Sequence, residues 1–209
     1  MEWSGLVLLV VGWLLGMLSP AVIELIATKR KLEPIKKQVR IECDELSRQL
    51  IIITFLCAKD TSSLDVELIT WCRAELNRVG SNCEGEEISE ILKDLSKSNS
   101  SQIQAINNAQ RDKEFEGRSL KKYELPYTMA HTTFIHNFDI ETQSIIWEVT
   151  NRIQILNQEI DSVREYMFLT FDESISSDNN IRIVNDIKRK YVFISKSCRA
   201  IVNVARKLS

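Results

Sequence analysis

Glycine and proline are scarce over most of this 209-residue chain. After residue 28 the only ones are Gly80, Gly85, Gly117, Pro34 and Pro126. Average usage would place roughly 13 glycines and 9 prolines in that length. β-Sandwiches, barrels and doubly wound α/β folds need turn glycines far more often than this. The scarcity excludes those folds and collagen-like chains, and it predicts an all-α protein.

A disulfide framework is also missing. The chain has five cysteines, an odd number, and they are irregularly spaced and mostly set within apolar patterns. Such cysteines are typical of reduced thiols in the cell interior rather than of a secreted, cross-linked domain. They are Cys43, Cys57, Cys72, Cys83 and Cys198.

No motif for catalysis, a cofactor or a metal is present. The chain has no glycine-rich phosphate loop, no Gly-x-Ser-x-Gly elbow and no His-Glu-x-x-His. His131 and His136 are five residues apart, which misses the i, i+4 spacing of a helical metal pair, and Cys72 and Cys83 form no Cys-x-x-Cys. We therefore expect no metal, no cofactor and no enzyme, although an active site built from scattered residues stays open as an alternative.

A long apolar run is present at the N-terminus. Residues Trp3–Ile23 carry no charge, and as a helix they would be about 31 Å long, close to the thickness of the hydrocarbon core. The chain begins Met1-Glu2, without the basic start of a signal peptide, and no Ala-x-Ala-like cleavage site follows the run. The prediction is a transmembrane helix with a short outer stub over residues 1–28.

The charges that follow the run predict its orientation. Residues 29–40 contain six bases and one acid, whereas no base precedes the run. Lys and Arg gather on the cytoplasmic side of a span, so residues 29–40 form a basic juxtamembrane segment. The predicted localisation is the inner (plasma) membrane, crossed once, with the N-terminus outside and the C-terminal domain in the cytoplasm.

Gly12 and Gly16 form a Gly-x-x-x-Gly pair within the run. Small residues at this spacing let two helices approach closely in lipid, which predicts a homo-oligomer packed through this face. The alternative is that glycine is simply common in membrane helices. Pro20 is expected to kink or split the helix.

Residues 41–138 are predicted to form a helical bundle with an aromatic and basic loop. Pro34 suits the first turn of a helix that leads into the dense apolar run Leu50–Ala58, which is too short to span a bilayer. The next stripe ends at Gly80, and two shorter helices follow it. Residues 118–138 are the least periodic part of the chain.

Residues 139–209 are predicted to form a long antiparallel, coiled-coil-like helical hairpin. Two apolar seams with alternating three- and four-residue steps are joined by a polar loop. The stretch from Asp139 to Glu173 has eight acids and two bases, and the stretch from Asp178 to Ser209 has eight bases and two acids, so the arms carry net charges of −6 and +6. The seams consist of Ile146, Val149, Ile153, Leu156, Ile160, Val163 and Met167, and of Val184, Ile187, Tyr191, Ile194, Cys198, Ile201, Ala205 and Leu208.

The candidate ligand site is the stretch from Arg118 to Tyr127. Bases could hold a phosphate while an aromatic ring stacks on a nucleobase. The alternative is a loop that tucks two tyrosines onto the bundle. The basic C-terminal helix is interpreted as a solvated face, so duplex nucleic acid is not an expected partner. The site residues are Arg118, Lys121, Lys122, Tyr123 and Tyr127.

The layout of a Trp3–Ile23 span, a Lys29-Arg30-Lys31 flank and a motif-poor helical domain resembles small membrane effectors of prokaryotic antiviral systems. These include nucleotide-activated CRISPR ancillary proteins and retron-associated membrane proteins. The resemblance implies binding of a cyclic oligonucleotide or similar signal, followed by membrane damage. We therefore expect an oligomeric membrane sensor or effector whose partners are lipid, its own copies and a cyclic nucleotide or protein. The alternative is a passive tether or scaffold that binds a cytosolic protein through the hairpin.

Overall fold

The computed structural model describes residues 3–80, 83–111, 113, 115, 117–172 and 174–208 of the chain. Side chains before residue 29 are described only at positions 7, 11–13, 16, 22 and 23, and those of residues 83–85 are not described. The side chain of Cys83 thus lies outside the described residues.

The chain is all-α, as predicted: it is 82% helical, and the described part contains no strand. Four helices form most of the body of the molecule: α1 (Trp3–Asp60), α2 (Val66–Val79), α7 (Ile140–Leu169) and α8 (Ser177–Ala205). The shorter elements are α3 (Cys83–Leu95), α4 (Ser100–Arg111), α5 (Pro126–Ala130), α6 (Thr132–Ile135) and the 3-10 turn η1 (Arg206–Leu208).

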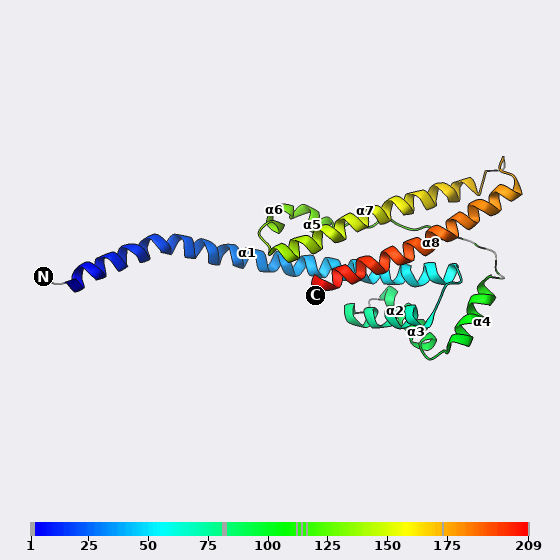
Figure 1. Cartoon of the computed structure of the whole chain (residues 1–209), viewed down its shortest axis with the longest axis horizontal. Coiled ribbons are helices and arrows are strands. Elements are labelled where there is room, and N and C mark those ends of the chain that lie inside the picture. Colours follow the sequence, from blue (N-terminus) through cyan, green and yellow to red (C-terminus); the bar gives the residue numbers. More distant parts are fainter. Residues whose placement is uncertain are drawn as a thin grey trace.

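Helix α8 lies at the centre of the molecule (Figure 1). It packs against α7 on one side and against the second half of α1 on the other, and α2 and α3 cover the far side of α1. The first part of α1 projects beyond this body, so the N-terminus lies far from the other helices. The core therefore forms where α1, α7 and α8 run side by side.

The second half of α1 is buried because apolar side chains occupy most of its circumference. Val39, Leu50 and Phe55 are at most 1% exposed. Thr54 and Ser195 join α1 to α8 within this core: Ser195 Oγ donates to the Thr54 carbonyl at 3.2 Å, and Thr54 Oγ1 donates to the Leu50 carbonyl at 2.7 Å. The buried hydroxyls thereby keep hydrogen-bond partners.

The N-terminal predictions need correction. The apolar run is not a separate element, because α1 continues as one helix of 58 residues through Pro20, Lys29–Lys31 and Pro34. Pro20 does not split α1, and Pro34 lies inside a helix rather than in its first turn. Within the described residues, none of the helices combines the length and the apolar character that a bilayer crossing needs. The predicted single-pass localisation in the inner membrane is therefore wrong.

Gly12 and Gly16 lie on the exposed, projecting part of α1. A Cβ added at either position would meet no atom within 4 Å. No described part of the chain packs on them, and their role in helix packing stays a prediction.

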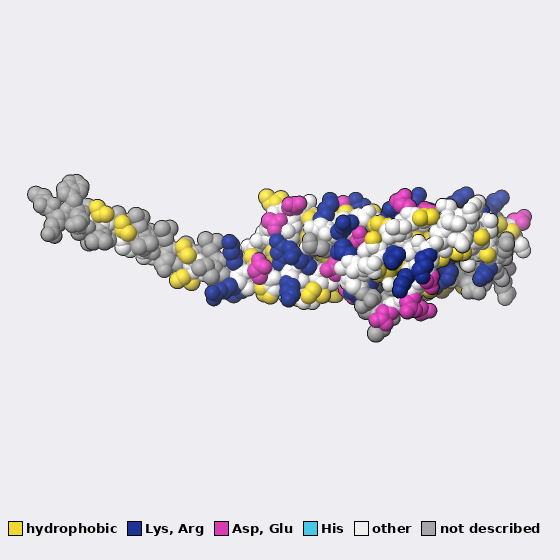
Figure 2. Space-filling view, turned by 90° about the horizontal axis from the view of Figure 1, so that it is seen from below, with side chains coloured by type: hydrophobic (Ala, Val, Ile, Leu, Met, Phe, Trp, Pro, Cys, Tyr) yellow, Lys and Arg dark blue, Asp and Glu magenta, His cyan; other side chains and the backbone are white. Residues whose placement is uncertain are grey.

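The surface charge is mixed (Figure 2). Dark-blue side chains gather where the projecting part of α1 meets the body. On α1, the bases Lys29, Arg30 and Lys31 are exposed. Over the visible face of the body, acidic and basic side chains are interspersed. This face shows no extended patch of one sign.

Candidate functional site

An extended segment, residues 117–125, crosses the body between the fourth and fifth helices and is held by side chains of α7 and α8. The Arg118 N–H donates to Tyr191 Oη at 2.6 Å, and that hydroxyl donates to the Arg118 carbonyl at 2.7 Å. Asn157 bonds both backbone groups of Tyr123, at 2.9 and 2.8 Å. Arg164 donates to the Leu120 carbonyl at 2.6 and 3.1 Å. These side chains satisfy backbone groups that lack a helix or strand partner.

The start of α5 is fixed in a similar way by Glu42 of α1. Its Oε1 accepts from the Tyr127 N–H at 2.7 Å, and its Oε2 accepts from the Thr128 N–H at 2.9 Å and from Thr128 Oγ1 at 2.5 Å. The His131 ring stacks on Tyr127 with ring centroids 4.1 Å apart, and its Nδ1 lies 2.9 Å from the Tyr127 carbonyl. The aromatic loop is therefore anchored on the bundle.

The structure divides the predicted ligand residues between two cavities. Arg118 lines one cavity, whereas Lys121, Lys122, Tyr123 and Tyr127 line another. Tyr123 is only 3% exposed, so its ring offers no free face to a nucleobase. Burial also raises the pKa of its hydroxyl, which keeps it protonated.

The cavity that contains the two lysines, about 410 Å³ in volume, is poorly suited to an anion. Its lining includes Lys121 and Lys122 but also three carboxylates, Glu42, Glu45 and Glu124. Lys122 is already paired with Asp161 at 2.6 Å. The net charge of the lining is thus slightly negative.

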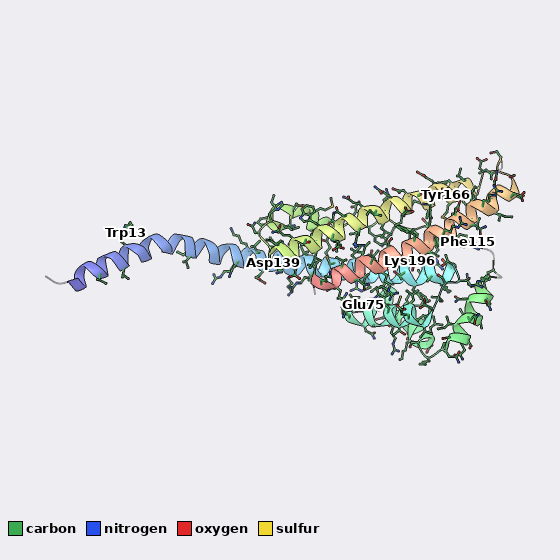
Figure 3. All side chains as sticks on the ribbon, viewed as in Figure 1. Trp13, Glu75, Phe115, Asp139, Tyr166 and Lys196 are labelled. Carbon is green, nitrogen blue, oxygen red and sulfur yellow. The ribbon has the colours of Figure 1, made fainter. Side chains whose placement is uncertain are left out.

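The cavity that contains Arg118 is larger, about 700 Å³, and we call it the basic cavity. Three parts of the chain line it: the end of α1 with the turn after it, the end of α4 with the residues that follow, and Lys188 of α8. It lies at the end of the body opposite the N-terminus, beside Phe115 (Figure 3). Its described charged residues are Lys59, Asp60, Arg111, Lys113, Arg118 and Lys188.

These residues give the described lining a net charge of +4, from five cations and one carboxylate. Arg118 pairs with Asp60, and the hydrogen bond between them raises the pKa of the guanidinium. The other four cations form no ion pair with the described residues. Three acids, Asp112, Glu114 and Glu116, lie close to Arg111 and Lys113 in the sequence, and these acids lie outside the described part of the chain.

Phe115 and Gly117 shape the wall of the basic cavity. The Phe115 ring packs edge-on against Tyr191 at 5.6 Å, and Lys188 Nζ lies 5.3 Å from its centre. Gly117 has a φ of +67°, a conformation that favours glycine, and a Cβ there would lie 3.0 Å from Met167 Cε. Glycine therefore lets the chain turn from the cavity into the segment held by Tyr191.

The described cysteines and histidines form no metal site. Within the described residues there is no group of three or more His, Cys, Asp or Glu placed to hold a metal ion. Cys43, Cys57, Cys72 and Cys198 are free and buried, and burial raises the pKa of the first three thiols to about 12 and that of Cys198 well above its ordinary value. These thiols remain protonated near neutral pH.

Sequence reasoning found Arg118 but missed the other cations of the basic cavity. Lys59, Arg111 and Lys188 come from three segments far apart in the chain, and nothing in the sequence brings them together. The only local signal is the alternation of charged residues that begins at Arg111.

No family model, curated protein or solved structure matches this chain.

Proposed function

We propose that this protein is a ligand sensor that binds a small phosphate-bearing molecule, such as a nucleotide, in the basic cavity. The observation that carries the proposal is the set of four cations without a described ion-pair partner around one hollow: Lys59, Arg111, Lys113 and Lys188. A volume of about 700 Å³ lies within the range of small-molecule sites. Lys and Arg side chains recognise phosphate oxygens through charge-assisted hydrogen bonds.

Arg118 connects the cavity to the rest of the fold. Its guanidinium pairs with Asp60 at the end of α1, and its backbone is held by Tyr191 of α8. A phosphate in the cavity would compete with Asp60 for this guanidinium. Binding would then change the contact between the end of α1 and the extended segment, which gives the ligand a route to alter the fold around it.

The test measures whether the full chain binds inorganic pyrophosphate, ATP and then cyclic nucleotides. Thermal unfolding and titration calorimetry detect the binding. A ligand that binds only the folded chain raises its melting temperature as its concentration exceeds the Kd. Added salt should weaken binding, because it screens the charges. Absence of stabilisation by every one of these phosphates contradicts the proposal.

Two lysines of α8 provide a matched pair of variants. Lys188→Glu reverses a charge inside the basic cavity and should weaken binding about tenfold or more. Lys196→Glu makes the same change at an exposed position farther along α8 and should leave the Kd unchanged (Figure 3). Equal effects of the two variants would show that the cations act through the general charge of the protein rather than through the cavity.

A second candidate function is a scaffold in which α7 and α8 form a hairpin that binds a partner protein. The observation that favours it is a group of exposed apolar side chains near the loop between these helices. Phe168, Phe171 and Ile181 are 76%, 79% and 62% exposed. Under this proposal, a double variant with Phe168→Ser and Phe171→Ser should no longer bind the partner protein. Its affinity for pyrophosphate should be unchanged.

A further inference from the structure

One aromatic ring, that of Phe115, lines the basic cavity. Every other side chain that the structure describes in the lining is charged or polar, apart from Gly117, which has none. Inorganic phosphate is recognised by cations and hydrogen-bond donors, and an aromatic ring adds nothing to that recognition. A nucleotide also carries a planar base, and bases stack on aromatic side chains. The ring therefore bears on what a bound phosphate is attached to.

The orientation of the Phe115 ring is fixed by Tyr191 of α8. Tyr191 is 0% exposed, and the two rings form a T-shaped pair with their centroids 5.6 Å apart. The Tyr191 hydroxyl is itself held by both backbone groups of Arg118. A buried, hydrogen-bonded neighbour thus orients the Phe115 ring before a ligand arrives, which reduces the entropy that binding costs (Figure 3).

Lys188, which also lines the basic cavity, lies over the Phe115 ring. Its Nζ is 5.3 Å from the centre of the ring, and it forms no ion pair with the described residues. A lysine ammonium sits on a flexible four-carbon stem, and an exposed contact between a cation and a ring is weak. A ligand that offers Lys188 a phosphate can therefore draw the ammonium away from the ring and leave that face to a base.

The two tyrosines that the sequence suggested for stacking do not combine a free ring with the cations. Tyr123 is buried, and Tyr127 already stacks on His131 with ring centroids 4.1 Å apart. Both line the smaller cavity, whose lining is slightly negative. Among the described residues, Phe115 is the aromatic side chain that shares one hollow with the cations.

Gln110 adds a neutral polar group to the lining of the basic cavity. Its amide has both donor and acceptor atoms and forms no side-chain hydrogen bond with the described residues, so it can bond a base or a ribose hydroxyl. We propose that the basic cavity binds a nucleotide whose base stacks on Phe115 while the cations hold its phosphates. This assignment rests on the phosphate binding proposed above.

The test compares the Kd values of ATP and of inorganic tripolyphosphate for the full chain, by titration calorimetry without divalent cations. Both ligands contain three linked phosphates, and tripolyphosphate carries the higher charge, so charge alone would not favour ATP. We expect ATP to bind about tenfold more tightly or better, because its base stacks. If tripolyphosphate binds and ATP binds no more tightly, this assignment is overturned and the proposed phosphate site stands. Binding of neither ligand contradicts the proposed function as well.

Phe115→Leu keeps an apolar side chain beside Tyr191 but removes the aromatic face. It should weaken ATP binding about tenfold and change the Kd of tripolyphosphate by less than about twofold. Phe193→Leu is the matched control: Phe193 is 46% exposed on α8, outside the cavity, and both Kd values should stay the same. Equal weakening of both ligands by Phe115→Leu would mean that the ring only shapes the cavity, which overturns the assignment.

Phe115→Trp gives a direct signal of stacking and does not depend on loss of binding. The new indole should be quenched by ATP beyond the response of the unmodified chain, because a base stacked on it lies in contact with its ring. Tripolyphosphate should not reproduce this quenching. Circular dichroism checks that each variant keeps its helix content, and the same fluorescence change with both ligands would contradict stacking.

Discussion

The three-helix core and the extended segment laid over it are stabilised in different ways. Along α8, side chains such as Ile187, Ile194 and Ile201 are at most 1% exposed and pack between α1 and α7. The segment 117–125 also buries Leu120, Tyr123 and Leu125, but its backbone is fixed by hydrogen bonds from Tyr191 and Asn157, residues 73 and 34 positions away from those they bind. Apolar burial supplies most of the free energy of folding, whereas the polar contacts determine where an irregular segment lies.

The largest expected effect comes from the core. Ile194→Ala removes a side chain that is 0% exposed, and it should lower the free energy of unfolding by about 2–5 kcal/mol. Ile181→Ala, at a position of α8 that is 62% exposed, should change it by less than about 0.5 kcal/mol. Urea unfolding measures the free energy of unfolding of both variants. Similar decreases in the two would contradict the distinction between core and surface positions.

The next effect concerns the polar contacts of α5. Glu42→Ala removes the acceptor of two backbone N–H groups and of the Thr128 hydroxyl, and it should cost about 1–3 kcal/mol of stability. Glu33→Ala, at an exposed carboxylate of the same helix, is the control and should be nearly neutral. A loss as large as that of Ile194→Ala would show that the loop is as important to stability as the core.

A smaller effect is expected in the extended segment. Asn157→Ala leaves the N–H and the carbonyl of Tyr123 without their partner and should cost about 1–2 kcal/mol. Hydrogen exchange should increase at residues 118–124 and remain slow in α8. Gln154→Ala, one turn away and exposed, should change neither quantity.

The smallest effect depends on pH. Asp139 precedes α7 and accepts from the Thr142 N–H and hydroxyl and from Lys36 of α1 (Figure 3). These bonds, those from Thr142 first, lower the pKa of the carboxyl below its ordinary value of 3.8. The resulting stability is present above that value and is lost as the pH falls below it. The difference between the unmodified chain and Asp139→Asn should therefore shrink between pH 5 and pH 2.

The fold class could be predicted because it depends on local composition and periodicity. The scarcity of glycine and proline excluded sheets, and Gly80 was correctly assigned as the end of a helix, since it caps α2 with a φ of +78°. The start of the same helix was predicted too early, because Ser62 followed by Asp65 three residues later resembles a capping box in which Ser62 is the cap. The structure has Asp65 at this position, accepting from the Leu68 N–H at 2.7 Å.

Other features could not be predicted because long-range contacts determine them. Pro34 disfavours a helix interior locally, yet α1 continues through it. The aperiodic residues 118–138 acquire their conformation from Glu42, Asn157 and Tyr191, which are distant in sequence. The basic cavity likewise combines three separate segments, so only Arg118 could be singled out beforehand.

The burial of the four free thiols turns them into built-in chemical reporters of opening. Burial raises the pKa of all four thiols, so they stay protonated at pH 7, and the folded chain also shields each sulfur from reagents. Alkylation of Cys57 or Cys72 must then wait until the helices around that sulfur separate. The rate of mass gain in iodoacetamide, resolved by peptide, thus measures the transient separation of α1 from α2 and α8 without an engineered cysteine.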